Sequence, residues 1–322
     1  MMHFRKCVTM LAALAAMAAA FVPAQADDYP NRRLIMIVGF AAGSGADILT
    51  RYYATKLAEA TGQTVIVENK PGANGNIAAV AAKQSKPDGY TVFFSPSAGM
   101  SGGKFLYANL GYDSQKDFVI AAPLLDVAFT LAVGANSPAK SVAELTALLK
   151  SKPNARYGTS NSTALAATQV YKTIAGFEAH QVAYKTTADA IPDLADGTLD
   201  FMFIDGTFGV GQHKAGKIRL LATTSTRIDS VPEIPTMREA GVGNYGFTVW
   251  FMIMVPAGTS PEIVNKLNAM FTKINQTDET RKFLSVSASV PLTGTPAEMV
   301  KKLDDDIKVW ADLAKGGNIV PQ

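Results

Sequence analysis

The chain has 322 residues, 48% of them hydrophobic and 18% charged, and its formal net charge at pH 7 is +3. Its lysines and arginines are scattered, so the sequence has no basic cluster to neutralise nucleic-acid phosphates, and we expect no nucleic-acid partner. The single cysteine, Cys7, and the well separated histidines His180 and His213 argue against a disulfide, a zinc site or a serine triad. We therefore expect neither a metal ion nor another cofactor.

The first 26 residues have the features of a secretory signal peptide. Arg5 and Lys6 precede an uncharged, mostly apolar run over residues 8–22, which is shorter than the ~20 residues that a membrane-spanning helix needs. Ala24-Gln25-Ala26 then provides small residues that fit a signal-peptidase site. We predict that the mature chain begins at Asp27 and is periplasmic. The alternative, an N-terminal membrane anchor, fits less well because Pro23 and these small residues end the apolar run.

Strand and helix patterns alternate along the mature chain. An apolar run at 34–38 predicts a buried strand, and a Gly-rich turn leads from it to a helical pattern over 47–60. The order repeats with a strand at 65–67, a helix at 76–85, a strand at 90–94 and then a polar turn, Ser95-Pro96-Ser97-Ala98-Gly99. Further strands are predicted at 118–124, 129–133, 201–204, 218–223 and 249–255. This alternation is typical of a doubly wound α/β fold with mostly parallel sheets.

Two long β-like runs predict where the chain passes between domains. About 296 mature residues are too many for one small core and suit two domains. The runs over 118–134 and 247–256 could each cross from one domain to the other. Two crossings predict a first domain of residues 27–126 plus 248–322 and a second of residues 127–247. The cleft between them would face the carboxyl ends of the strands, where open α/β sheets bind ligands.

The first candidate loop, residues 38–47, lies between a predicted strand and a predicted helix and contains no cation. Gly43 and Gly45 let the backbone approach a ligand closely, and the free N–H groups and positive dipole end of the helix would face an anion there. Asp47 is expected to cap the helix rather than to contact a ligand, because its charge would repel an anion.

The same loop has two enzymatic interpretations. Gly43-Ser44-Gly45 followed by Glu68 about 25 residues later resembles part of a dinucleotide-binding fingerprint, but Ile48 stands in place of the third glycine. Ser44 is not a nucleophile of the Gly-x-Ser-x-Gly type, because Ala42 and Ala46 replace the two glycines. An exported dinucleotide-dependent or hydrolytic α/β enzyme is therefore the second hypothesis.

The second candidate loop, residues 157–163, precedes a helical pattern over 164–174. Thr159, Ser160, Ser162 and Thr163 could donate hydrogen bonds to a carboxylate next to the amides of the helix start. Taken alone, this loop fits equally simple helix capping, which needs no ligand.

Asp205 ends the apolar strand predicted at 201–204 and is the third candidate. It could hold a ligand hydroxyl, an amine or a water, or it could cap the turn at Gly206. The sequence favours neither role over the other.

A series of motifs, in order along nearly the whole mature chain, resembles the extracytoplasmic solute receptors (Bug-type) of tripartite tricarboxylate transporters. No single motif is decisive, but their order and spacing together are specific. They include Tyr29-Pro30, Val38-Gly39-Phe40-Ala41-Ala42-Gly43, Val67-Glu68-Asn69-Lys70-Pro71-Gly72-Ala73, Pro87-Asp88-Gly89-Tyr90-Thr91, Lys116-Asp117-Phe118, Tyr157-Gly158-Thr159, Tyr184-Lys185, Ala215-Gly216-Lys217-Ile218-Arg219 and Val255-Pro256-Ala257-Gly258-Thr259.

The resemblance implies a two-domain Venus-flytrap receptor, monomeric and not an enzyme. Such a receptor closes on a small carboxylate, such as a di- or tricarboxylate, an acidic amino acid or an aromatic acid, and hands it to membrane permease subunits. Ser44 and Thr186 stand where glycines are usual in the family, which changes the shape of the ligand site. The implied ligand-binding residues are Phe40, Ala41, Ala42, Gly43, Ser44, Ser95 and Ser97 in the first domain and Thr159, Ser160, Asn161, Ser162, Thr163, Thr186 and Asp205 in the second.

Overall fold

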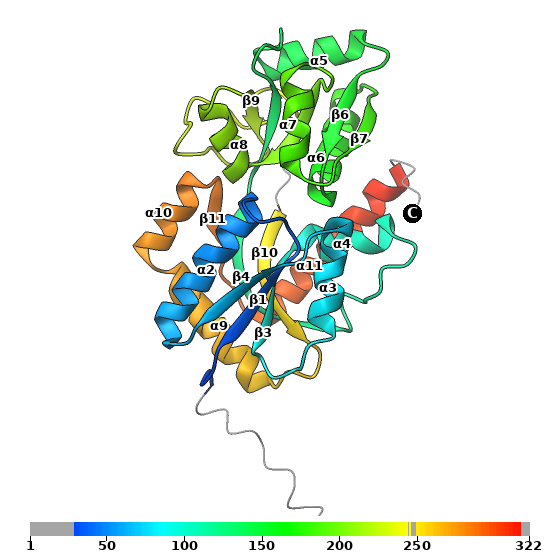
Figure 1. Ribbon diagram of the computed structural model, residues 1–322. Coiled ribbons are helices and arrows are strands. Elements are labelled where there is room, and N and C mark those ends of the chain that lie inside the picture. Colours follow the sequence, from blue (N-terminus) through cyan, green and yellow to red (C-terminus); the bar gives the residue numbers. More distant parts are fainter. Residues whose placement is uncertain (1–28, 244, 246–248, 317–322) are drawn as a thin grey trace, which may run out of the picture.

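The computed structural model describes residues 29–243, 245 and 249–316 (Figure 1). The predicted signal peptide, residues 1–26, and the predicted domain boundary at residue 248 lie outside these ranges. No helix within the described ranges is long and apolar enough to span a membrane.

The first of two sheets has six strands in the order β11-β4-β10-β3-β1-β2. Its strands are β1 (Leu34–Val38), β2 (Val65–Asn69), β3 (Thr91–Pro96), β4 (Phe118–Val127), β10 (Val249–Pro256) and β11 (Ser289–Pro291). The helical segments of this domain are α2 (Gly45–Thr61), η2 (Ala73–Gly75), α3 (Asn76–Lys83), α4 (Ser97–Leu106), α9 (Pro261–Asn275), α10 (Asp278–Val286) and α11 (Pro296–Gly316).

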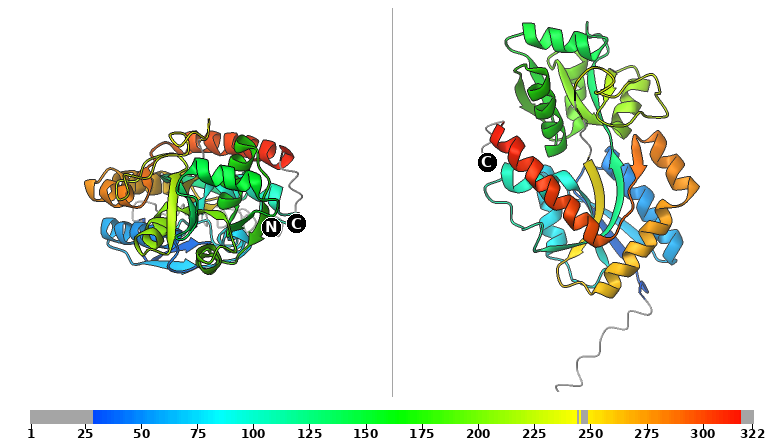
Figure 2. Two further views of the ribbon diagram at one scale, coloured as in Figure 1. Left: turned by 90° about the horizontal axis from the view of Figure 1, so that it is seen from above. Right: turned by 180° about the vertical axis from the view of Figure 1, so that it is seen from behind.

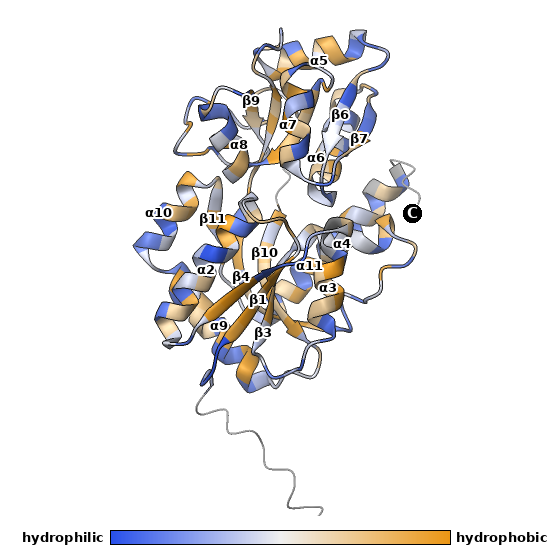
Figure 3. Cartoon of the chain, viewed as in Figure 1, coloured by the Kyte–Doolittle hydropathy of each residue, from blue (hydrophilic) through white to orange (hydrophobic). Residues whose placement is uncertain are grey.

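Helices cover both faces of this sheet because successive strand residues point to opposite sides. Phe94 belongs to a buried cluster with Leu49 of α2 and Leu267 of α9, whereas Phe93 belongs to a second cluster with Ala79 of α3 and Leu303 of α11. Figure 2 shows α11 running across the rear of the molecule, and Figure 3 shows β1 and β3 as strongly hydrophobic.

The second sheet has five strands in the order β7-β6-β8-β5-β9. Its strands are β5 (Phe129–Gly134), β6 (Arg156–Thr159), β7 (His180–Ala183), β8 (Phe201–Asp205) and β9 (Ile218–Thr223), and its helices are α5 (Val142–Ser151), α6 (Ser162–Ala175), α7 (Thr187–Ala195) and α8 (Gly206–Lys214). The molecule is thus the predicted α/β protein with two domains, and the chain crosses between the sheets where β4 meets β5.

The predicted α/β fold is confirmed, and its two sheets are mixed, with both parallel and antiparallel strand pairs. β1 pairs in parallel with β2 and β3, and β6 with β7 and β8. By contrast, β10 is antiparallel to β3 and β4, β11 to β4, and β5 to β8 and β9. The reason is the direction of crossing: β1, β3, β4, β6 and β8 end at the interface between the domains, whereas a strand that enters a sheet from that interface must run the opposite way. Alternating strand and helix patterns carry no information about this reversal.

Candidate functional site

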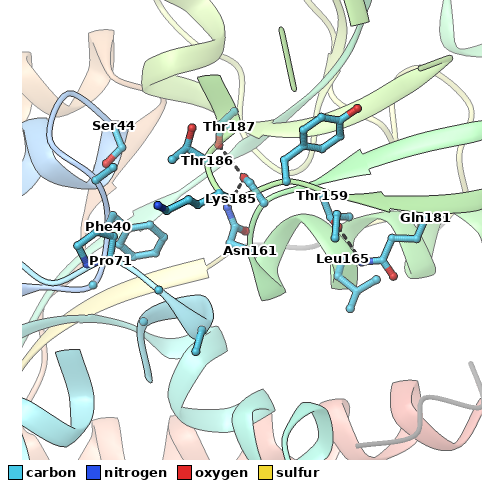
Figure 4. A pocket seen from close by; sticks show the side chains of 18 of the residues that line it. Phe40, Ser44, Pro71, Thr159, Asn161, Leu165, Gln181, Lys185, Thr186 and Thr187 are labelled. Atoms are coloured by element: carbon cyan, nitrogen blue, oxygen red, sulfur yellow. Dashed lines mark hydrogen bonds between the residues drawn. The ribbon is translucent and has the colours of Figure 1, made fainter. Parts of the chain in front are cut away.

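A cavity of about 300 Å³ lies between the domains, at the carboxyl ends of the parallel strands (Figure 4). The first domain contributes the β1–α2 loop and the segment around η2, and the second contributes the β6–α6 and β7–α7 loops. Its described lining residues are Gly39, Phe40, Ala41, Ser44, Pro71, Gly72, Ala73, Gly75, Tyr107, Thr159, Ser160, Asn161, Leu165, Gln181, Ala183, Tyr184, Lys185, Thr186 and Thr187.

A smaller recess of about 40 Å³ adjoins this cavity and shares Phe40, Ser44, Asn161 and Thr187 with it. The rest of its wall is mainly apolar, with two further polar side chains, Thr163 and Asp205. The apolar residues are Ala46, Leu49, Val127, Phe129, Val249 and Phe251. We call this the inner recess and the larger space the outer cavity.

The N-termini of four helices converge on these two spaces. Ser44, Asn161, Thr186 and Asp205 are the N-cap residues of α2, α6, α7 and α8, and each lines the outer cavity or the inner recess. Their side-chain oxygens accept hydrogen bonds from Asp47 N at 3.3 Å, Ala164 N at 2.9 Å, Asp189 N at 3.3 Å and Phe208 N at 2.9 Å, respectively. The amides and positive dipole ends of α2, α6 and α7 therefore face the outer cavity, which favours an anion there, whereas the start of α8 faces the inner recess and carries the Asp205 carboxylate.

Hydroxyl groups add further donors. The Ser160 and Thr187 hydroxyl oxygens are 2.8 Å apart, and Gln181 Nε2 donates to Thr159 Oγ1 at 2.7 Å. A hydroxyl that accepts a hydrogen bond keeps its own hydrogen, so Ser44 and Thr186 can cap their helices and still donate to a ligand oxygen. Capping and ligand binding are thus compatible at these positions.

Asp47 lies in the first turn of α2, whose N-cap is Ser44, and it lines neither space. Its carboxylate accepts hydrogen bonds from Gly43 N at 2.9 Å, Arg51 Nε at 3.0 Å and Asn69 Nδ2 at 2.8 Å. Burial alone would raise the pKa of Asp47, but these hydrogen bonds outweigh it and lower the pKa. The amide of Gly43 is therefore already occupied by this carboxylate.

Asp205 caps α8, which is one of the two roles that the sequence leaves open for it, and it also lines the inner recess, where its contact with a ligand stays a prediction. Burial raises its pKa to about 6, although the hydrogen bond from the Phe208 amide opposes this shift. Its carboxylate also lies directly against the backbone of Gly45 at the start of α2, where the Cβ of any other residue would overlap Asp205 Oδ1. This contact joins the two domains.

The structure brings nine of the fourteen predicted site residues to these spaces and places five elsewhere. Phe40, Ala41, Ser44, Thr159, Ser160, Asn161 and Thr186 line the outer cavity, and Thr163 and Asp205 line the inner recess. Ala42, Gly43, Ser95, Ser97 and Ser162 line neither space, and as ligand contacts they stay predictions that the two spaces do not support.

The polar turn predicted at 95–99 is wrong, which explains the position of its two serines. Ser95 lies within β3, and its hydroxyl contacts the carbonyl of Pro96 at 3.4 Å. Ser97 begins α4, and its hydroxyl accepts a hydrogen bond from Trp250 N at 3.4 Å. Small residues and three glycines made this helix resemble a turn in the sequence.

Apart from Thr186, the sequence prediction missed the lining residues of β7 and the β7–α7 connection, because it placed no strand at 180–183. Gln181, Tyr184 and Lys185 all line the outer cavity. Figure 4 shows the side chain of Lys185 extending across the cavity toward Phe40. The only indication in the sequence was the motif Tyr184-Lys185, which pointed to the family but not to a place in the site.

No cluster of three or more metal-binding side chains occurs among the residues that the structure describes. The lining residues offer amides, hydroxyls, one amine and one carboxylate, which is a set suited to binding a polar molecule.

Residues 49–319 match the model of the tripartite tricarboxylate transporter family receptor. This chain belongs to that receptor family. It is 34% identical over 270 residues to a UPF0065 protein of Bordetella bronchiseptica, with 83% of this chain and 80% of the relative covered. It is 29% identical over 320 residues to Protein BugT of Bordetella pertussis, with 98% of both chains covered.

Solved structures of similar proteins agree with this assignment. R. palustris Rpa4515 with adipate superposes with a TM-score of 0.87 at 31% identity, covering 91% of this chain and 100% of that one. MatC from Rhodopseudomonas palustris with bound malate superposes with a TM-score of 0.80 at 25% identity, covering 88% and 99%. The chain is therefore a solute-binding receptor of a periplasmic family and not an enzyme, so the dinucleotide-dependent and hydrolytic hypotheses are wrong.

Proposed function

We propose that this receptor captures a small organic carboxylate between its two domains and delivers it to the membrane subunits of a tripartite tricarboxylate transporter. The observation that carries the proposal is the convergence of three helix N-termini, those of α2, α6 and α7, on the outer cavity, together with neighbouring hydroxyl groups. Fixed amide dipoles in an enclosed space hold an anion without needing a neutralising arginine. The adipate and malate in the structures of Rpa4515 and MatC support the same class of ligand.

The proposal includes export and domain organisation. Residues 1–26 would direct the chain to the periplasm and be removed, and the receptor would act there as a monomer. The domains would be residues 27–126 plus 248–322 and residues 127–247, with the ligand contacting both. Phe40, Ala41, Ser44, Thr159, Ser160, Asn161, Thr163, Thr186 and Asp205 would surround it.

Titration calorimetry of residues 27–322 against aliphatic and aromatic carboxylates tests this proposal, with product analysis of each mixture. We expect at least one acid to bind and to be recovered unchanged. Ser160→Ala removes a hydroxyl from the outer cavity and should weaken binding roughly ten- to a hundredfold, the effect of losing one hydrogen bond to a charged group. Ser151→Ala, on α5 outside both spaces, is the matched control and should leave affinity unchanged.

The result that would count against the proposal is the absence of binding to every acid in the panel. Equal affinities for native protein and the Ser160→Ala variant would instead show that the ligand site lies elsewhere.

A further inference from the structure

Lys185 occupies a special position among the charged residues of the site. It follows β7 and lies just before α7, and its side chain reaches into the outer cavity toward Phe40 (Figure 4). It is the only lysine or arginine among the described residues that line the outer cavity or the inner recess. Of those lining residues, only Asp205 is acidic, and it lies in the inner recess.

The amine of Lys185 has no carboxylate partner in the described part of the chain, unlike many other lysines of this protein. Lys152, for example, pairs with Asp200 at 2.7 Å, and Lys56 pairs with Glu59 and Glu279, each at 2.8 Å. A cation that faces a ligand cavity without a counter-charge is satisfied by an anionic group of the ligand.

Lys185 lines the outer cavity and Asp205 lines the inner recess, so the two parts of the site differ in how well they accept a carboxylate. A carboxylate in the inner recess would meet the carboxylate of Asp205 and mainly apolar side chains, which both disfavour it. A carboxylate at the starts of α6 and α7 would meet amides and hydroxyls, and a second one on the side of Phe40, toward which Lys185 extends, would meet the Lys185 amine. A cavity of about 300 Å³ is large enough for such a small ligand.

We propose that Lys185 is a specificity-determining residue that recognises a second carboxylate, so that the receptor prefers a dicarboxylate to the monocarboxylate of the same chain length. This inference rests on the proposed carboxylate-binding function. It assigns to Lys185 the discrimination between dicarboxylate and monocarboxylate ligands. The helix starts bind the first carboxylate in both ligands, so Lys185 contributes only to the diacid.

The experiment compares two matched ligand pairs, adipate with hexanoate and succinate with butyrate, by titration calorimetry on residues 27–322. Native protein should bind the diacid of at least one pair about tenfold more tightly than its monoacid, the effect of one charge-assisted hydrogen bond. Lys185→Met should remove this preference and leave the monoacid affinity within about twofold. Lys185→Arg should retain the preference because it keeps the charge.

Lys150→Met is the matched control, since Lys150 is an exposed lysine on α5, away from both spaces. It changes the net charge equally and should alter neither affinity. The inference is overturned if Lys185→Met weakens both members of a pair equally, or if native protein does not prefer the diacid in either pair, and carboxylate binding then still stands. If native protein binds none of the four acids, both this inference and the proposed carboxylate capture are overturned.

Discussion

Asp205 combines three features that make it the most informative single residue of the site. It caps α8, it lines the inner recess, and its carboxylate touches Gly45 of the other domain. Burial raises its pKa to about 6 from the usual value of 3.8. Because this carboxyl binds a proton more readily in the folded protein than in the unfolded chain, it makes the folded protein more stable at low pH.

We predict that Asp205→Asn removes a pH-dependent loss of stability from the ligand-free protein. As pH rises from about 4 to 6, Asp205 in the unfolded chain loses its proton while the folded protein still holds one, so the free energy of unfolding falls, by up to about 3 kcal/mol. Asparagine keeps an acceptor for the Phe208 amide but does not titrate. Urea unfolding at several pH values measures the difference between variant and parent.

The comparison with the parent protein separates Asp205 from Asp126 and Asp306, whose pKa values burial also raises. Asp229→Asn, an exposed position in a loop, serves as the control substitution. Parallel stability curves for parent and Asp205→Asn between pH 4 and 6 would contradict the prediction.

At the same scale, sequence reasoning located the β1–α2 and β6–α6 loops of the outer cavity but missed Lys185. Ser160 and Asn161 follow a strand and start a helix, a pattern that a sequence displays directly. Lys185 follows β7, of which every described residue is at least partly exposed and only Val182 and Ala183 are apolar. Such a strand lacks the apolar alternation that reveals strands in a sequence.

At the scale of elements, the starts of α2 and α8 meet so closely that the contact requires glycine. A Cβ at Gly45 would overlap the carboxylate of Asp205, and one at Gly206 would overlap Ala288. Nearby, Thr207 Oγ1 donates to the carbonyl of Ser287 at 2.9 Å. The second domain therefore packs against the first through the beginning of α8.

We predict that Gly45→Ala weakens ligand binding at least about tenfold while the isolated helix gains stability. Alanine favours a helix over glycine by about 1 kcal/mol, but its methyl group would push α2 away from Asp205 and separate the two domains. Gly211→Ala in α8 is the matched control, because a Cβ there meets no atom within 4 Å. It should raise the melting temperature and leave affinity unchanged.

Titration calorimetry and thermal unfolding of the two glycine variants decide this point. Unchanged affinity in Gly45→Ala would mean that the ligand does not need α2 and α8 in contact.

Element boundaries were predictable where the apolar signal is strong. The predicted strands at 34–38 and 218–223 coincide with β1 and β9. β6, β7 and β11 were not predicted, because they have only four, four and three residues and little apolar alternation. The directions of β5 and β10 could not be predicted either, since they follow from crossings between domains rather than from local pattern.

At the scale of the whole molecule, the two sheets share one continuous buried cluster near the crossing strands. Phe94 and Phe251 of the first sheet, Phe129 of β5 and Phe203 of β8 all belong to it. Ala128 N, beside Phe129, donates to the carbonyl of Ala288 of the first domain at 2.9 Å. This shared core fixes the relative position of the domains on the side where the chain crosses, and the ligand cavity opens beyond it.

Composition and motif order were sufficient to predict this two-domain receptor fold, because alternating apolar runs and helix starts are local features. The cavity was less predictable, since its shape depends on how two separately folded halves face each other. Four N-caps distributed from Ser44 to Asp205 come together around the outer cavity and the inner recess only after that packing.

A crystal structure of residues 27–322 grown with adipate would show where the ligand lies and which groups hold it. We predict a carboxylate between the domains, with its oxygens at hydrogen-bonding distances of about 2.7–3.2 Å from amides or hydroxyls at the starts of α6 and α7, including Ser160. Adipate bound outside the outer cavity and inner recess, or held only by exposed surface cations, would contradict the account.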